Sequence, residues 1–263
     1  MTGIARPQLV AVEEPTTAGI AVRLSDVGKS YRAGRSPVVA VEHISLTVDV
    51  GEFVCLVGPS GCGKSTLLSL IAGLDRPSSG RVDTDGRRVA MMFQEPALFP
   101  WLTAAENVEL PLRARRVPKR QRRRRAVDLL DTVGLIEFAD KRPHQLSGGM
   151  RQRVALARAL AQDADVLVMD EPFGALDAIT RDLLHGELER ICQDRHLTVL
   201  FVTHNVREAA RLGDRVVLLS NRPGRIVAEF TVPVARPRQI NTAVMAEVAA
   251  MITARLQRVC DDR

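Results

Sequence analysis

Five short apolar segments, each bounded by turn-forming residues, recur along the chain. They are rich in Val, Leu and Ile, and polar residues do not alternate with apolar ones inside them. This pattern is typical of strands that are buried on both faces of a mostly parallel sheet. The sequence therefore predicts strands at residues 53–58, 89–94, 166–172, 198–204 and 215–220.

Two earlier segments, residues 19–31 and 39–50, alternate apolar and polar positions more regularly. Such alternation favours a half-exposed antiparallel sheet. Apolar residues at helical spacing lie between the predicted strands, for example in residues 64–72 and 178–192. Together these features predict an α/β core with a mostly parallel sheet and an antiparallel β-subdomain.

The pattern changes between residues 95 and 163, where no strand is predicted and helical periodicity dominates, as in residues 127–139. We interpret this region as an α-helical subdomain inserted into the core. The expected organisation is a flexible leader at residues 1–19, an α/β unit at 20–238, and a C-terminal helix at 239–263 that packs on the core.

Composition narrows these expectations. Aromatic residues make up only 3% of the chain, so aliphatic residues must build the core. No apolar run reaches the ~18 residues needed to span a bilayer, and the N-terminal residues lack the apolar centre of a signal peptide. Cys55, Cys62, Cys192 and Cys260 show no Cys-x-x-Cys spacing, which indicates a reducing compartment and no disulfide framework or zinc site.

The net charge of +6 comes from one local run of cations. Residues 113–125 hold nine Lys and Arg and no acid, and removing these nine charges leaves −3 for the rest of the chain. The run contains no aromatic residue that could stack on bases, and Pro118 interrupts it. We therefore interpret it as a solvated helix face and expect no nucleic-acid partner, with contact to anionic lipid headgroups as the alternative.

A glycine-rich motif follows the predicted strand at residues 53–58 and begins a predicted helix. The segment GPSGCGKST fits the pattern G-x-x-x-x-G-K-[ST], in which glycines let backbone N–H groups wrap around phosphates at the positive end of a helix. We expect Lys64 to reach the β- and γ-phosphates of ATP and the Ser65 hydroxyl to ligate Mg²⁺. The predicted nucleotide-binding residues are Gly58, Pro59, Ser60, Gly61, Cys62, Gly63, Lys64, Ser65 and Thr66.

Polar residues at the ends of three other predicted strands complete a candidate catalytic set. Asp170 ends a buried strand, where it would support Mg²⁺ directly or through water. The adjacent Glu171 would polarise the attacking water as a general base. His204 would contact the γ-phosphate and orient the water, and Gln94 would touch both Mg²⁺ and the water.

A second glycine pair lies in the segment LSGGMRQR. Ser147, Gly148 and Gly149 precede an amphipathic helix, so exposed N–H groups and a hydroxyl form a second anion site. One chain cannot easily close both glycine loops on the same nucleotide, whereas two chains arranged head to tail can. The sequence therefore predicts an ATP-dependent two-fold dimer with two composite sites.

The ordered motifs GPSGCGKST, FQEP, LSGGMRQR, VLVMDEP, GALD and VTHN resemble the ATP-binding subunit of ABC transporters, over nearly the whole chain after about residue 20. The resemblance implies a P-loop NTPase fold of the ABC type and an active ATPase that binds ATP and Mg²⁺. It implies that Tyr31, in a loop after the first strand, stacks on adenine, with an exposed loop tyrosine as the alternative. The further implied roles are Q-loop glutamine for Gln94, signature motif acting in trans for Ser147–Gly149, D-loop aspartate for Asp177, and switch histidine for His204.

Two further stretches, residues 97–108 and 220–238, are similar to importers of nitrate, sulfonate and taurine. This similarity implies a peripheral subunit on the cytoplasmic face of the inner membrane. Its partners would be transmembrane permease subunits and, indirectly, a solute-binding protein. Trp101 would anchor the permease, although packing inside the helical subdomain is the alternative.

Two other functions stay open at this stage. One is an ATPase of an exporter or lipid transporter with the same fold, against which the FPW and RPGR segments argue. The other is a soluble ABC ATPase that acts on nucleic acid, for which residues 113–125 are the only support. The sequence does not identify the transported solute, because the other subunits of such transporters select it.

Overall fold

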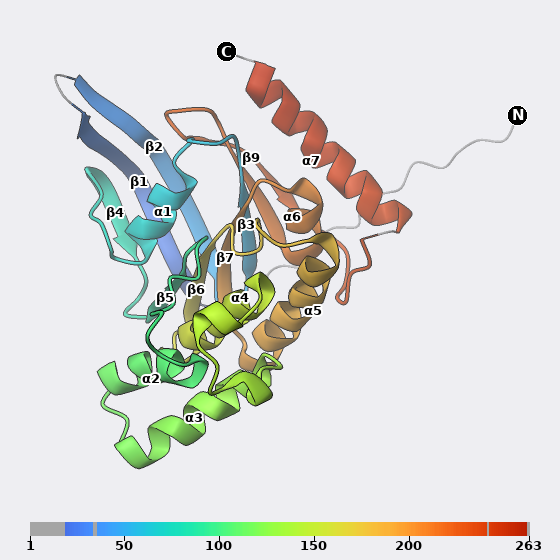
Figure 1. Ribbon diagram of the computed structural model, residues 1–263. Coiled ribbons are helices and arrows are strands. Elements are labelled where there is room, and N and C mark those ends of the chain that lie inside the picture. Colours follow the sequence, from blue (N-terminus) through green and yellow to red (C-terminus); the bar gives the residue numbers. More distant parts are fainter. Residues whose placement is uncertain (1–18, 34–35, 241, 262–263) are drawn as a thin grey trace, which may run out of the picture.

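The computed structural model describes residues 19–33, 36–240 and 242–261, and its centre is a six-stranded sheet (Figure 1). The strand order is β5-β6-β7-β3-β8-β9, in which all neighbours are parallel except the antiparallel pair β8–β9. The strands are β3 (Phe53–Val57), β5 (Val89–Met92), β6 (Val166–Asp170), β7 (Thr198–Thr203), β8 (Arg215–Leu219) and β9 (Ile226–Thr231).

A second, antiparallel sheet has the order β2-β1-β4. It comprises β1 (Ile20–Ala33), β2 (Ser36–Asp49) and the short β4 (Ser79–Asp83). Helix α1 (Lys64–Ile71) follows β3 and packs between this sheet and the central one. The two sheets and α1 share one apolar core.

Alternate residues of β3 belong to different cores, as expected for a strand covered on both faces. Val54 and Leu56 face α1 and the antiparallel sheet. Phe53, Cys55 and Val57 face the helices on the other side. Those helices are α4 (Gly148–Leu160), α5 (Ala178–Arg195) and α6 (Val206–Leu212), and α7 (Ala243–Asp261) packs on α6.

The segment between β5 and β6 is helical in the structure. It contains α2 (Ala104–Ala114), α3 (Lys119–Thr132), two single 3₁₀ turns, η1 (Ile136–Phe138) and η2 (Pro143–Gln145), and then α4. Helices α2, α3 and α4 contact one another; α4 lies against the sheet, and α2 and α3 extend below it in Figure 1. Among the described residues, no helix is both long and apolar enough to cross a bilayer.

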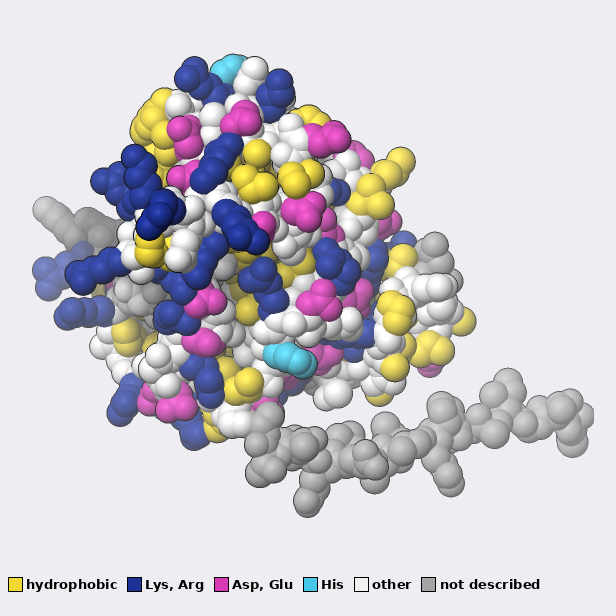
Figure 2. All heavy atoms as spheres, turned by 90° about the horizontal axis from the view of Figure 1, so that it is seen from below, with side chains coloured by type: hydrophobic (Ala, Val, Ile, Leu, Met, Phe, Trp, Pro, Cys, Tyr) yellow, Lys and Arg dark blue, Asp and Glu magenta, His cyan; other side chains and the backbone are white. Residues whose placement is uncertain are grey.

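The cationic residues 113–125 form the end of α2, a turn and the start of α3. Arg115 pairs with Asp163 at 2.5 Å, and Arg123 pairs with Asp140 at 2.5 Å. Within the described part of the chain, the other cations of this run have no ion pair. Figure 2, seen from the side of α2 and α3, shows Lys and Arg side chains gathering on one flank of this face.

Several elements differ from the sequence-based expectations. Strand β5 ends at Met92, so Gln94 lies two residues beyond it. The helix expected at residues 127–139 stops at Thr132, because Gly134 takes a left-handed φ of 66°. Strands β4 and β9 were not predicted, and the expected leader lies outside the described residues except for Gly19.

Candidate functional site

The sheet order brings four motif-bearing strand ends to one edge. Strands β5, β6, β7 and β3 are neighbours and parallel, so their carboxyl ends lie together. Asp170 is the last residue of β6, and Gln94, His204 and Gly58 follow the ends of β5, β7 and β3. In open α/β sheets this edge is where ligands bind, and motifs far apart in the sequence meet there.

The glycine loop is shaped by backbone conformations that other residues rarely adopt. Gly61 and Gly63 have φ angles of 78° and 97°. A Cβ atom on Gly63 would lie 2.5 Å from Val41 Cγ1 and 2.7 Å from Ala40 O. Gly63 is therefore required both for its φ and for close contact with β2, and it starts α1 with the helix N–H groups free to face a ligand.

Lys64 is held at the loop, 6% exposed, with its ammonium on backbone carbonyls. Its Nζ donates to Gly58 O and to Pro59 O, at 2.8 Å each. Cys62 Sγ lies 3.8 Å from the same Nζ. Burial raises the pKa of the Cys62 thiol despite this cation, so the thiol packs in the loop as a neutral group.

Asp170 and Ser65 form the part of the edge that fits a divalent cation. Burial raises the pKa of Asp170, Glu171 adds to this effect, and a hydrogen bond from Ser65 opposes it. A cation would remove the cost of the buried negative charge. One hydroxyl and one carboxylate match the way proteins hold Mg²⁺, which takes most of its other ligands from water and phosphate.

Glu171 and His204 are in direct contact at the same edge. His204 Nδ1 lies 3.0 Å from Glu171 Oε2. Glu171 has a φ of 43°, and its N–H donates to Val202 O at 3.0 Å, which ties the turn after β6 to β7. A positive φ at a non-glycine residue is a strained geometry found frequently at functional sites.

A buried polar network fixes the segment that carries His204. Thr203 donates to one carboxylate oxygen of Glu208, and His185 Nε2 lies 2.5 Å from the other. All three side chains are buried. Asn205 caps α6 by accepting from the N–H of Arg207 at 3.0 Å. Helices α5 and α6 thus hold the backbone on both sides of His204 in place.

A cavity of about 260 Å³ opens between the glycine loop, β1 and Glu171. Its lining includes the predicted residues Tyr31, Ser60, Gly61, Gly63, Lys64, Ser65, Thr66 and Glu171. Sequence reasoning missed three further residues that line it, Val38, Ala40 and Arg222. Only the register of β2 on β1, and the fold of the β8–β9 turn, bring these three to the cavity.

Tyr31 lies inside β1, opposite Val38, and not in a loop as expected. It is 41% exposed, and its hydroxyl donates to Asp75 Oδ2 at 3.1 Å. Lys29 Nζ lies 4.9 Å from the ring centroid. The ring is thus held at the cavity mouth, with area free for stacking on a planar ligand.

The second glycine pair does not reach this cavity. Ser147 caps α4, and its hydroxyl accepts from the N–H of Met150 at 3.2 Å. Asp177 caps α5 by accepting from Thr180 N–H at 2.9 Å. A Cβ on Gly149 would lie 2.6 Å from Thr180 Cγ2. The structure therefore brings Ser147–Gly149 and Asp177 together, and both lie outside the cavity lining.

Gln94 is exposed, and its side chain also lies outside the cavity lining. Its backbone carbonyl accepts from Gln152 Nε2 of α4 at 2.8 Å. Gln94 therefore links the segment after β5 to helix α4 of the helical region.

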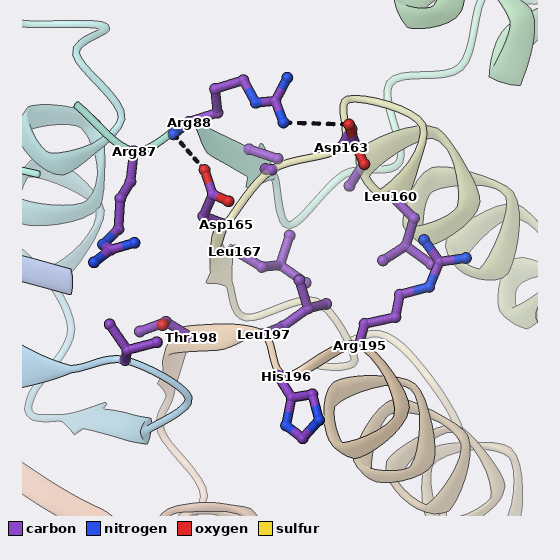
Figure 3. Close-up of a pocket in the computed structure, with 14 residues that line it drawn as sticks. Arg87, Arg88, Leu160, Asp163, Asp165, Leu167, Arg195, His196, Leu197 and Thr198 are labelled. Carbon is purple, nitrogen blue, oxygen red and sulfur yellow. Dashed lines mark hydrogen bonds and ion pairs between the residues drawn. The ribbon is translucent and has the colours of Figure 1, made fainter. Parts of the chain in front are cut away.

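Another cavity, of about 350 Å³, lies at the opposite, amino ends of β5, β6 and β7 (Figure 3). Arg88 bridges it, with its guanidinium 3.2 Å from Asp163 and its N–H 3.0 Å from Asp165. The charges of Arg88 and Asp163 in this cavity are thus paired. None of the described residues that line the cavity belongs to a glycine loop. This cavity is not part of the sheet edge that carries the glycine loop.

Trp101 is 65% exposed, which excludes packing inside the helical region. Phe99 is 42% exposed, and the two ring centroids are 5.4 Å apart. The buried Asn107 holds this segment, since its Oδ1 accepts from Phe99 N–H at 2.8 Å. The two rings form an exposed aromatic pair ahead of α2.

Comparison with known proteins identifies this arrangement. The family model for the ABC transporter matches residues 41–174. The bicarbonate transport ATP-binding protein CmpD of Synechocystis sp. is 43% identical over 89% of this chain and 86% of its own. The nitrate import ATP-binding protein NrtD of Synechocystis sp. is 47% identical over 80% of this chain and 82% of its own.

The fold is also that of solved ATP-binding cassettes. A dimeric cassette in a post-hydrolysis state, bound to ADP and Pi, has a TM-score of 0.74 and 35% identity, and it covers 81% of this chain and 100% of that chain. An inward-facing metal-chelate type transporter has a TM-score of 0.71, with 26% identity over 80% of this chain and 83% of that chain. The predicted fold class is thus confirmed, and the chain belongs to the ABC transporter family.

Proposed function

We propose that this chain is the ATP-hydrolysing subunit of a membrane ABC importer for a small oxyanion, with nitrate or bicarbonate as the favoured solute. The observation that carries the hydrolytic part is the Glu171–His204 contact of 3.0 Å, because Glu171 lines the same cavity as Lys64. The names of the relatives support the solute class. For sulfonate or taurine as the solute, the motif resemblance is the only support.

The residues of the cavity have separate roles in this proposal. The glycine loop and Lys64 bind the phosphates, and Lys64 exchanges its two carbonyl partners for phosphate oxygens. Tyr31 stacks on adenine. Glu171 accepts a proton from the attacking water, and His204 holds the Glu171 carboxylate and the water in line. Ser65, Asp170 and Gln94 would hold Mg²⁺, which supplies charge neutralisation at the phosphates.

A second copy of the chain completes each site. The N–H groups at the start of α4 and the Ser147 hydroxyl form an anion site outside the cavity, so they serve the nucleotide of the partner copy. Asp177 lies beside them and would line the same interface. Related cassettes have been solved as dimers. ATP then joins the two copies, and hydrolysis separates them.

The helical region, at about residues 95–163 of an ATPase unit spanning 20–238, is proposed to dock on the permease at the cytoplasmic face of the membrane. The Phe99–Trp101 pair is the anchor, because exposed aromatic rings are strong contributors to protein interfaces. Gln94 joins this region to the sheet. The chain itself does not contact the solute, which a separate binding protein would deliver. The C-terminal helix, expected within residues 239–263 and described as α7, is a packing element of the core.

Replacement of Glu171 by Gln tests the hydrolytic role. We expect the ATPase rate to fall about 10²–10⁴-fold, the usual contribution of a general base, while ATP binding persists. Glu137→Gln is the matched control, since Glu137 is exposed in the helical region. A Glu171→Gln protein that hydrolyses ATP at the normal rate would refute the assignment.

Purification of the tagged chain from gently solubilised native membranes tests the transporter assignment. A stoichiometric multi-span membrane protein should co-purify, and Trp101→Ala should lose it while still binding ATP. Leu74→Ala is the control, because Leu74 is 62% exposed but lies outside the helical region. If the chain is recovered only with nucleic acid, and that binding weakens steeply with salt, the result would favour a soluble ABC ATPase that acts on nucleic acid.

A further inference from the structure

The turn between β8 and β9 packs directly on the glycine loop and β2. The Gly224 N–H donates to Ala40 O at 2.9 Å, and its carbonyl accepts from Glu42 N–H at 3.0 Å. A Cβ atom on Gly224 would lie only 2.1 Å from Cys62 O. Within the turn, the Ser220 hydroxyl accepts from Arg225 N–H at 2.9 Å. The turn is therefore rigid and in contact with the backbone that binds phosphates.

One charged side chain of this turn faces two cavities. Arg222 lines the nucleotide cavity, and its Nε donates to Gly61 O at 3.2 Å. It also lines a second cavity, of about 450 Å³, between the turn, β9 and α7. A displacement of this guanidinium, or an anion bound to it, in one cavity therefore changes the electrostatic potential in the other.

The second cavity has a strongly cationic lining, with three arginines and no acid among the side chains that the structure describes there. Its residues are Ser220, Asn221, Arg222, Pro223, Arg225, Val227, Arg255 and Val259. Arg225 is neutralised, since its Nη2 lies 2.6 Å from Glu42 Oε2. Arg255 Nη2 donates to Val227 O at 3.4 Å. Neither Arg222 nor Arg255 has a carboxylate partner in the part of the chain that the structure describes.

These groups match the chemistry of a small planar or tetrahedral oxyanion. Two guanidinium groups supply charged, fork-shaped donors, and the Asn221 amide supplies a neutral one at the same cavity. Such charge-assisted hydrogen bonds are about twice as strong as neutral ones. Arg255 comes from α7, so that helix contributes a ligand group as well as packing.

We propose that the second cavity is an oxyanion site, and that an anion bound between Arg222 and Arg255 weakens nucleotide binding. In the free protein Arg222 adds positive charge to the nucleotide cavity. An anion on the other side of the turn neutralises that charge and draws the guanidinium from Gly61. By linkage, ATP weakens anion binding by the same factor. The biological meaning of this coupling rests on the proposed function. In an importer ATPase, the anion that inhibits ATP binding would be the transported solute or the phosphate product.

Calorimetry on the nucleotide-free protein tests the site directly, with nitrate, bicarbonate and phosphate titrated separately. ATP affinity is then measured with and without each anion, at an ionic strength held constant with chloride. We expect each effective oxyanion to weaken ATP binding about tenfold. Arg255→Gln should lose both the anion binding and this effect and keep its basal ATP affinity, because Arg255 does not line the nucleotide cavity.

Arg258→Gln is the matched control, since Arg258 lies three residues further along α7 and outside the cavity lining. It should behave like the unaltered protein. A response to nitrate and bicarbonate identifies the solute as the effector, and a response to phosphate alone identifies the product; both support the site. No anion binding to the unaltered protein, or an anion effect that persists in Arg255→Gln, would overturn it. Failure to bind ATP without anions would count against the proposed function only.

Discussion

At the residue scale, single atoms decide whether the nucleotide loop can form. Gly63 combines a φ of 97° with two contacts under 3.0 Å for any added Cβ. The sequence motif predicted that a glycine is needed there, because the loop must approach phosphates closely. It did not predict the contact with Val41 and Ala40, since only the fold brings β2 against the loop. The same limit explains why Arg222 was missed.

Gly63→Ala should destabilise the protein by about 2–4 kcal/mol, from left-handed backbone strain and from overpacking against β2. Denaturant unfolding of the nucleotide-free protein measures this. Gly51→Ala separates the two causes, because Gly51 has a φ of 79° but no atom within 4 Å of an added Cβ. It should lose only the strain component, about 1–2 kcal/mol. Equal losses would contradict the packing explanation.

The raised pKa of Asp170 gives a stability effect of known sign. Above the ordinary value of 3.8, the folded state keeps a proton that the unfolded state has lost, so stability falls as pH rises towards the raised pKa. Asp170→Asn removes this contribution. The stability of the variant relative to the unaltered protein, without Mg²⁺, should therefore increase over that pH range and then level. A difference that is flat or decreasing with pH would contradict burial as the dominant cause.

At the element scale, the sequence predicted the buried strands and helices of the core. It did not predict the exposed strand β4 or the position at which β1 ends. Buried strands such as β3 and β7 have long apolar runs. Strand β4 is exposed or half-exposed throughout, and its five residues carry no apolar pattern. Tyr31 is the last residue of the alternating segment 19–31, and it belongs to β1 and not to a loop because β2 extends far enough to pair with it. Pairing between distant strands decides these cases.

The contact between α4 and α5 was also beyond sequence reasoning, and it can be tested. Alanine at Gly149 would suit a helix, but its Cβ would lie 2.6 Å from Thr180 Cγ2. We expect Gly149→Ala to cost about 1–3 kcal/mol through overpacking. Thr180→Ser removes that methyl group and keeps the hydroxyl on Asp177. Unfolding of the single and double variants should show recovery in the double variant, and additive losses would disprove the contact.

At the scale of the whole molecule, the separation of two glycine loops is the central feature. The first lines the cavity with Glu171, whereas Ser147–Gly149 lies beside Asp177 outside that lining. The sequence predicted this division from the spacing of the motifs along the chain. The structure adds that the second loop and the cap of α5 form one surface. A second copy of the chain is the partner that would bring this surface to the nucleotide.

The most direct test is the molecular mass of the Glu171→Gln variant by light scattering in Mg²⁺ and ATP. Because this variant should bind ATP without hydrolysing it, the composite-site account predicts twice the chain mass of 28.8 kDa. The same protein without nucleotide, or with ADP, should have the single mass. A mass of one chain in saturating ATP would contradict the account, since both loops would then have to act without a second copy.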